Sequence, residues 1–207
     1  NTLILLREMH LRRLMRMERS VPEKYEGLWR RRIIIRRDGT SDSTTDVWWF
    51  QSPSYSIDLR VPVSSTAGQK TAFAGVTIQS TSAEGEILEW RPDIAFPGIS
   101  DEVDAGYVTL NTPDELHERG LDGSYDEDWY KVENGEMTSS RSVDGDLFNF
   151  VIEGSIWKAV AKGRPTDSYF GHEEDQSKWT EVSVYRKSED TTEWRLVAST
   201  IELSFLH

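Results

Sequence analysis

Charged and amide side chains recur beside tryptophans in segments of this chain that have the composition of β-strands. Asp58 and Arg60 lie two residues apart, as do Glu89 and Arg91, so each pair shares one face of a strand. Burial of a charge is costly unless a partner matches it. These side chains therefore either lie on a wet outer face or are paired inside the protein.

Residues of these types could perform acid–base chemistry in an aromatic pocket. A carboxylate against an apolar wall has a raised pKa and can act as a general acid or base. A guanidinium can hold an oxyanion or a substrate carboxylate. The predicted catalytic residues are Glu127 or Asp58 as the carboxylate and Arg60 or Arg91 as the guanidinium. The predicted substrate-binding residues are Trp29, Trp49, Gln51, Glu89, Trp90 and Trp129.

The same residues also have a purely structural interpretation, which the sequence leaves open. In it, the two acid–base pairs are ion pairs that close one end of a barrel, and the tryptophans are core residues. Lesser candidates for proton donors are Tyr55, Tyr107 and Tyr125.

Motifs that bind cofactors or metals are absent from the sequence. It contains no Gly-rich phosphate loop, no dinucleotide fingerprint, no Gly-x-Ser-x-Gly elbow and no His-Glu-x-x-His. The chain has no cysteine, and its four histidines are widely scattered. We therefore expect no metal ion and no cofactor, so that any reaction in the pocket is cofactor-free.

The charge of the chain is acidic overall and unevenly distributed. The formal net charge is −12, yet residues 1–37 hold 11 Lys or Arg against 4 Asp or Glu. An acidic body argues against a nucleic-acid partner, because phosphate neutralisation dominates such binding. No stretch approaches the roughly 20 apolar residues that cross a bilayer, so we expect no transmembrane segment. The lack of cysteine suits a reducing compartment, and we expect a cytoplasmic protein.

Residues 1–20 have the pattern of a basic amphipathic helix. Apolar residues recur near helical spacing with arginines between them, namely at Leu3, Leu6, Met9, Leu14 and Met17. Val21-Pro22 ends this helix, because the residue before a proline avoids helical geometry. Its role stays open between a helix packed on the main domain, a targeting helix, a membrane-surface helix and a lid over a barrel mouth.

From residue 25 onward, short runs of strand-forming residues are separated by turn signals. Ile57 and Leu59 share one face of such a run, and Asp58 and Arg60 share the other. Residues 112–120 are the one segment that we predict as a short helix. About ten or eleven strands with no βαβ rhythm predict an all-β fold, and we expect a closed antiparallel β-barrel.

Several motifs follow one another along the predicted strands. They are Gly27-Leu28-Trp29-Arg30-Arg31, Val47-Trp48-Trp49-Phe50-Gln51, Ile57-Asp58-Leu59-Arg60-Val61-Pro62, Phe73-Ala74-Gly75, Glu89-Trp90-Arg91-Pro92, Asp104-Ala105-Gly106 and Glu127-x-Trp129. In this order they resemble a lipocalin-like family of uncharacterised bacterial and fungal proteins related to the yeast Hrr-interacting protein. The resemblance covers residues 25–207 and implies a lipocalin-like (calycin-type) β-barrel domain, in one lobe or two connected lobes. It implies no reaction.

Two functions follow as hypotheses. In the first, the barrel binds a small hydrophobic molecule in an aromatic-lined pocket, either as a carrier or as a cofactor-independent isomerase, cyclase or lyase. In the second, its own side chains fill the barrel, and the chain is a non-catalytic protein–protein interaction module. An open aromatic cavity with a buried carboxylate would favour the first. A protein partner or a homo-oligomer is compatible with both.

Overall fold

The computed structural model describes residues 21–64, 68–98, 103–165, 180–188 and 190–201. The predicted helix over residues 1–20 lies outside this part of the chain. Within it, the one helical element is a short 3-10 turn at Glu23–Tyr25, and no helix has the length and apolar character needed to cross a membrane. The strands are β1 (Gly27–Arg36), β2 (Ser41–Asp42), β3 (Thr45–Gln51), β4 (Ser56–Pro62), β5 (Thr71–Ser82), β6 (Gly85–Phe96), β7 (Asp104–Thr112), β8 (Glu115–Gly120), β9 (Tyr125–Glu133), β10 (Thr138–Asp144), β11 (Leu147–Glu153), β12 (Trp157–Gly163), β13 (Glu181–Lys187) and β14 (Trp194–Ser199).

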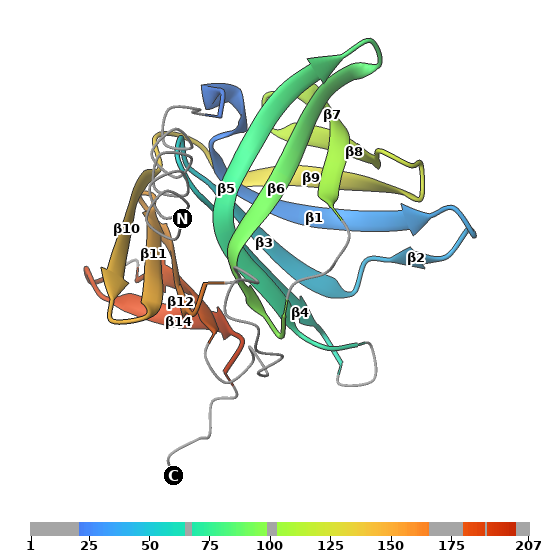
Figure 1. The fold of residues 1–207 in the computed structure, drawn as a ribbon. Helices are drawn as coiled ribbons and strands as arrows, with labels where there is room; N and C mark the ends of the chain where they lie inside the picture. The colour runs from blue at the N-terminus through green and yellow to red at the C-terminus, as the bar shows by residue number, and fades with distance from the viewer. Residues whose placement is uncertain (1–20, 65–67, 99–102, 166–179, 189, 202–207) are drawn as a thin grey trace, which may run out of the picture.

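Eight of these strands close into an antiparallel barrel (Figure 1). Strands β1 and β3 to β9 pair in sequence order, and β9 returns to pair with β1, from Leu28 opposite Glu133 to Arg36 opposite Tyr125. The short strand β2 adds a further pairing at the end of β1. Closure leaves the eight strands no free edge along which to aggregate. The predicted all-β barrel is therefore confirmed.

The remaining strands, β10 to β14, form a second antiparallel sheet beside the barrel (Figure 1). This sheet packs on the outer face of the barrel, chiefly over β4, with β6 also in contact. Trp48, Phe50 and Ile57 of the barrel join Phe150 and Val184 of the second sheet in one buried core. The outer wall of the barrel is therefore dry on this side.

A second core, made largely of tryptophans, lies inside the barrel. Trp29, Trp49, Trp90 and Trp129 are buried there together with Leu88. Tryptophan suits this position because one side chain buries a large apolar area. A cavity remains between these rings and the charged side chains of the barrel interior, and this cavity is the candidate site.

Strand β4 shows how the two cores share one strand. Ile57 and Leu59 belong to the outer core, whereas Asp58 and Arg60, on the opposite side of the pleat, line the barrel interior. The predicted alternation is confirmed. Because the second sheet covers the apolar face of β4, the polar face has to point into the barrel instead of toward bulk water.

One carboxylate ties the end of the barrel to the start of the second sheet. Glu133, the last residue of β9, accepts hydrogen bonds from the backbone N–H groups of Ile156 at 2.8 Å and Trp157 at 3.0 Å, and another from the hydroxyl of Ser155. A Cβ on Gly154 would lie 2.6 Å from Oε2 of Glu133, so the loop can approach this closely because residue 154 is glycine. Hydrogen bonds as well as apolar packing therefore hold the second sheet on the barrel.

Two features of the predicted strand pattern differ from the structure. Residues 112–120, predicted as a short helix, form a turn and strand β8 of a hairpin with β7. Leu116, Glu118 and Gly120 alternate toward the interior as strand residues do. The described residues also form fourteen strands and not ten or eleven, because the segments from residue 138 onward build a separate sheet beside a barrel of eight strands.

Candidate functional site

A cavity of about 100 Å³ lies inside the barrel. Its wall combines aromatic and charged side chains, and every strand of the barrel contributes at least one of them. The lining residues are Ile34, Trp49, Asp58, Arg60, Phe73, Trp90, Asp104, Glu118, Tyr125, Glu127 and Trp129.

The aromatic part of the wall is built around Trp49 of β3. Its ring contacts Trp90 edge-on at 5.4 Å and Trp129 edge-on at 5.7 Å between centroids. Trp29 stacks on Trp49 from behind at 6.0 Å. Edge-to-face and offset contacts of this kind are favourable aromatic geometries, so the rings hold one another in place.

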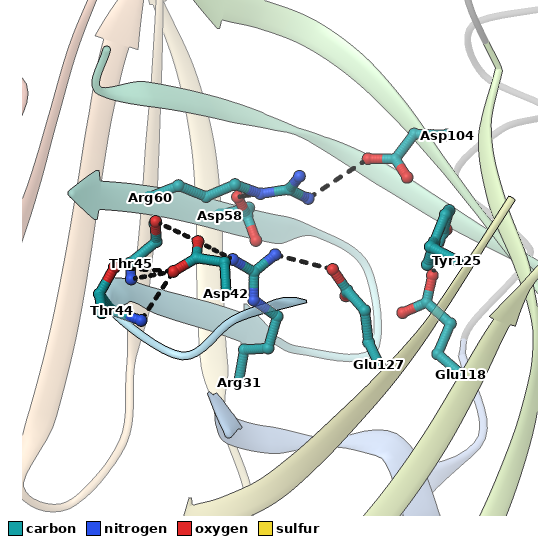
Figure 2. Close-up of polar contacts among 10 residues, drawn as sticks. All are labelled: Arg31, Asp42, Thr44, Thr45, Asp58, Arg60, Asp104, Glu118, Tyr125 and Glu127. Carbon is teal, nitrogen blue, oxygen red and sulfur yellow. Dashed lines mark hydrogen bonds and ion pairs between the residues drawn. The ribbon is translucent and has the colours of Figure 1, made fainter. Parts of the chain in front are cut away.

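Asp58 and Arg60 form an ion pair on the wall contributed by β4. Nε of Arg60 donates a hydrogen bond of 2.8 Å to Asp58, and the same guanidinium lies 3.5 Å from the carboxylate of Asp104 (Figure 2). Burial raises the pKa of Asp58, with Arg60 opposing the shift. The Asp58 carboxylate in turn raises the pKa of Arg60, so the guanidinium stays charged.

Glu127 of β9 pairs with Arg31 of β1, across the seam that closes the barrel. Nη1 of Arg31 donates a hydrogen bond of 2.7 Å to Glu127, and its Nη2 lies 3.5 Å from Asp42. Asp42 is itself held by the hydroxyl and backbone N–H groups of Thr44 and Thr45 (Figure 2). Hydrogen bonding to Thr45 is the main cause of the lowered pKa of Asp42. The carboxylate of Asp42 therefore helps to hold the guanidinium of Arg31 next to Glu127.

Glu118 of β8 is bound in a different way from the other buried carboxylates. The phenol of Tyr125 donates a hydrogen bond of 2.7 Å to Glu118 (Figure 2), and among the described residues no Arg or Lys forms an ion pair with it. Glu118 lies directly opposite Glu127 in the register of β8 and β9. Burial, and then the charge of Glu127, raise the pKa of Glu118 well above its usual range. Burial also raises the pKa of Glu127, with Arg60 and Arg31 opposing the shift. Of the two facing carboxyl groups, Glu118 therefore has the stronger tendency to hold a proton, because Glu127 is the one that cations support.

Two glycines make room for this pair. Gly106 of β7 and Gly120 of β8 are cross-strand partners. A Cβ on Gly106 would lie 2.6 Å from Cγ of Glu118, and one on Gly120 would lie 2.7 Å from the ring of Tyr125. Glycine at these two positions lets the carboxyl and phenol groups lie flat against the sheet.

The structure brings six of the predicted site residues together on the cavity wall. They are Asp58, Arg60, Glu127, Trp49, Trp90 and Trp129. Two others lie behind the wall and support it. The indole N–H of Trp29 donates to the carbonyl of Tyr25 at 2.8 Å, and Oε1 of Gln51 accepts from Trp49 at 3.2 Å and from Thr77 at 2.8 Å.

Glu89 and Arg91 do not line the cavity. Strand β6 turns Leu88 and Trp90 inward, so the residues at the intervening positions face outward. Arg91 donates to Glu89 at 2.5 and 3.0 Å, and both side chains are partly exposed. Glu89 and Arg91 thus form a partly exposed ion pair on the outside of the barrel.

The sequence did not indicate Glu118, Asp104 or Arg31 as site residues. The sequence pattern hides Glu118 because it predicts a helix over residues 112–120. If the same segment is a strand, Glu118 lies between residues 116 and 120 on the inward face. Arg31 follows the inward Trp29 by two residues, which is a usable signal. Asp104 opens a strand and the motif Asp104-Ala105-Gly106, but the motif gives no sign that its carboxylate lines a cavity.

Metal binding has no support in the geometry. In the ranges that the structure describes, no three His, Asp or Glu side chains converge as ligands for a metal ion. The charged groups of the cavity pair with one another or with hydroxyl groups instead.

Comparison with known proteins adds information on the fold. No protein-family model matches this sequence, and no curated protein is significantly similar to it. Among solved structures, the chain is similar to the crystal structure of an uncharacterized protein, YLR301w, from Saccharomyces cerevisiae. The TM-score is 0.61, the sequence identity is 13%, and the match covers 87% of this chain and 90% of the yeast chain. At this identity the likeness concerns the fold alone, an all-β barrel with added strands.

Proposed function

We propose that the barrel binds a small molecule in the interior cavity and that Glu118 and Glu127 transfer protons to and from it. The observation that carries this proposal is that two buried carboxyl groups in different environments lie opposite each other on the wall of one cavity. Glu118 has only a phenol as partner, whereas Arg31 supports Glu127. Facing titratable groups whose pKa values are pushed apart are the usual basis of acid–base assignments.

The roles follow from these environments. Glu127, held as a carboxylate by Arg31, acts as the base and takes a proton from one atom of the bound molecule. Protonated Glu118 acts as the acid and gives its proton to a second atom, while a bonding electron pair moves between the two atoms. The result is an isomerisation or a ring closure that needs no oxidant and no cofactor. Transfer of the proton from Glu127 back to Glu118, its cross-strand neighbour, restores the starting state.

The size of the cavity limits the ligand. Pockets for drug-sized molecules usually measure about 300–1,000 Å³, and an apolar cavity of about 150 Å³ holds one benzene. A cavity of about 100 Å³ accordingly suits a molecule of a few non-hydrogen atoms. The hydrophobic ligand expected from the sequence fits the tryptophan side, but the carboxylates opposite favour a molecule that also has a polar group.

The open cavity also supports a pocket over the alternative hypothesis of a filled barrel in a protein-interaction module. We further propose that the barrel is of the lipocalin type and that the chain is a distant relative of the lipocalin-like family noted above. Support comes from the sequence order of eight closed strands, the arrangement of up-and-down barrels such as lipocalins. The cytoplasmic location remains a prediction from composition.

A cavity-filling variant tests the proposal. Ile34 lines the cavity and is buried, whereas the next residue, Ile35, is 45% exposed on the outside of the same strand. Native mass spectrometry of the purified protein should reveal a retained small molecule, absent from Ile34→Trp and present in the control Ile35→Trp. A protein that carries no small molecule, or an Ile34→Trp variant that carries it equally well, would contradict the proposal.

A further inference from the structure

The charges around the cavity do not balance. Four carboxyl groups line it, and they belong to Asp58, Asp104, Glu118 and Glu127. Within the described residues, two guanidinium groups face them: Arg60, which also lines the cavity, and Arg31 behind Glu127. If all these groups were ionised, negative charge would be in excess.

Both guanidinium groups are already engaged. Arg31 binds Glu127 at 2.7 Å and Asp42 at 3.5 Å, and Arg60 binds Asp58 at 2.8 Å and Asp104 at 3.5 Å. An anionic ligand would have to displace one of these carboxylates and would then lie among the others. An excess of carboxylates in a partly dry cavity instead favours a cation, since a buried charge is stable only when it is matched.

The aromatic part of the cavity wall also suits a cation. Trp90 and Trp129 each lie edge to face with Trp49, and Phe73 also lines the cavity. The face of an aromatic ring, tryptophan best of all, attracts a cation within about 6 Å. A desolvated organic cation gains from this contact, whereas a metal ion would need converging oxygen or nitrogen ligands, which the described residues do not supply.

An unsatisfied donor provides an independent sign that the cavity is shaped for a ligand. Nε1 of Trp129 is buried without a hydrogen-bond partner, and the residue as a whole is 3% exposed. Buried polar groups are nearly always paired in folded proteins. A bound molecule that carries an oxygen or another acceptor atom would supply the missing partner; an ammonium group alone would not, because it only donates hydrogen bonds.

We propose that the cavity takes a small organic cation that also carries an acceptor oxygen, such as a protonated amino alcohol, between the carboxylates of Glu127 and Asp104 and the tryptophan rings. This inference rests on the proposed small-molecule function and adds the charge of the ligand. It predicts that charge, at constant shape, decides affinity.

Three tert-butyl compounds of different charge test it: tert-butylammonium, tert-butanol, which has nearly the same shape, and the larger anion pivalate. Each is titrated into the full chain at neutral pH and equal ionic strength, and the tryptophan fluorescence is followed. We expect tert-butylammonium to bind at least tenfold more tightly than tert-butanol, and pivalate to show no saturation. If tert-butanol or pivalate binds as tightly as the ammonium, the cavity is a ligand site and the cation inference alone is overturned. If none of the three binds, the cation inference is overturned, and the mass spectrometry described above decides separately whether the cavity holds any molecule.

Substitution of a cavity carboxylate identifies the groups that give the preference for a cation. Asp104→Asn removes a carboxylate from the cavity, and we expect it to lower the ammonium affinity about tenfold without changing that for tert-butanol. Glu115→Gln, with a side chain that is 46% exposed outside the cavity, is the matched control and should keep the preference. If Asp104→Asn does not fold, as judged by near-UV circular dichroism, Glu127→Gln takes its place, because Glu127 also lines the cavity. A variant that folds and keeps the full preference for the ammonium would overturn the assignment.

Discussion

Tyr125 donates a hydrogen bond of 2.7 Å to Glu118, so a buried carboxyl group in this barrel has a neutral partner while its neighbour Glu127 has a cationic one. The geometry that allows this is local. Gly106 and Gly120 leave space on the adjoining strands for both side chains, and β8 and β9 place Glu118 opposite Glu127. This difference in partners should affect how stability depends on pH and how costly substitutions at the two carboxyl groups are.

The pH dependence of stability should report the protonation of Glu118. Its pKa is raised in the folded protein by burial and by Glu127 and Asp104, against the opposing effects of Tyr125 and Arg60. Between the unfolded pKa, about 4.3, and the raised folded pKa, the native state binds more protons than the unfolded state. Stability therefore falls as pH rises, by at most about 1.4 kcal/mol per pH unit for this group. Asp58 and Glu127, whose pKa values burial also raises, add to the same trend.

Glu118→Gln removes one titrating group from this window. Urea unfolding from pH 4.5 to 7.5 should show a shallower decline in the free energy of unfolding than the unaltered protein shows. Glu115→Gln serves as the surface control and should keep the original slope. Equal slopes for the unaltered protein and Glu118→Gln would mean that Glu118 titrates normally.

The ion pair between Glu127 and Arg31 should be costly to break from one side. Both side chains are nearly inaccessible, with 6% and 7% exposure. Glu127→Gln leaves a buried guanidinium with Asp42 as its partner, and we expect a loss of about 3 kcal/mol in unfolding free energy. The double variant Arg31→Met, Glu127→Met should recover much of this loss, because it removes both charges together.

Asp126→Asn is the matched control for Glu127→Gln. Asp126 precedes Glu127 on β9 with a side chain 50% exposed beside His117, so its change should cost less than about 1 kcal/mol. Urea denaturation of the unaltered protein, Arg31→Met, Glu127→Met and the double variant completes the cycle. If the losses of unfolding free energy in the two single variants simply add in the double variant, Arg31 and Glu127 do not form a coupled buried pair.

The sequence predicted which residues share a face of a strand, but it did not predict what packs against that face. Alternation separated Ile57 and Leu59 from Asp58 and Arg60 correctly, because a pleat fixes which residues share a face. It did not reveal that the apolar face packs on a second sheet, since strand pairing and sheet packing join residues far apart in sequence. Glu89 and Arg91 have the same spacing as Asp58 and Arg60, yet they lie outside the barrel.

Glu118 was hidden for a local reason. Thr112-Pro113-Asp114-Glu115 has the residue types of a helix N-terminus, with proline at the first turn and acids after it. In the structure the same residues form the turn between β7 and β8, because pairing with β7 and β9 outweighs local propensity.

Arg60 and Arg91 form a natural matched pair for testing the effect of position. Each binds an acid two residues earlier in its strand, but Arg60 does so in the cavity and Arg91 on the surface. Arg60→Met should cost about 3–5 kcal/mol, because Asp58 is left buried without its cation. Arg91→Met should cost less than about 1 kcal/mol, as expected for an exposed pair. Thermal unfolding of both variants compares them directly, and similar losses would show that Asp58 is not desolvated as the structure implies.

Glycine at position 106 should be required by the side chain of Glu118. Gly106→Ala introduces a Cβ 2.6 Å from Cγ of Glu118, and we expect a loss of about 1–3 kcal/mol from overpacking. The loss should shrink in a Glu118→Ala background, because the clashing atoms are gone. Gly98→Ala is the control, since a Cβ there meets nothing within 4 Å. An equal loss in both backgrounds, measured by chemical denaturation, would place the cause elsewhere.

The most direct test of a ligand site in the barrel compares two tryptophans by NMR. The indole Nε1 atoms of Trp129 and Trp48 are both buried without hydrogen-bond partners, but Trp129 lines the cavity, whereas Trp48 lies in the core under the second sheet. In 1H–15N spectra recorded while each of the three tert-butyl probes is added, the Trp129 indole signal should shift to saturation with at least one probe, and the Trp48 signal should stay in place. A Trp129 signal that moves with none of the probes, or that moves only as much as that of Trp48, would contradict the ligand site that the cation inference assigns to the cavity.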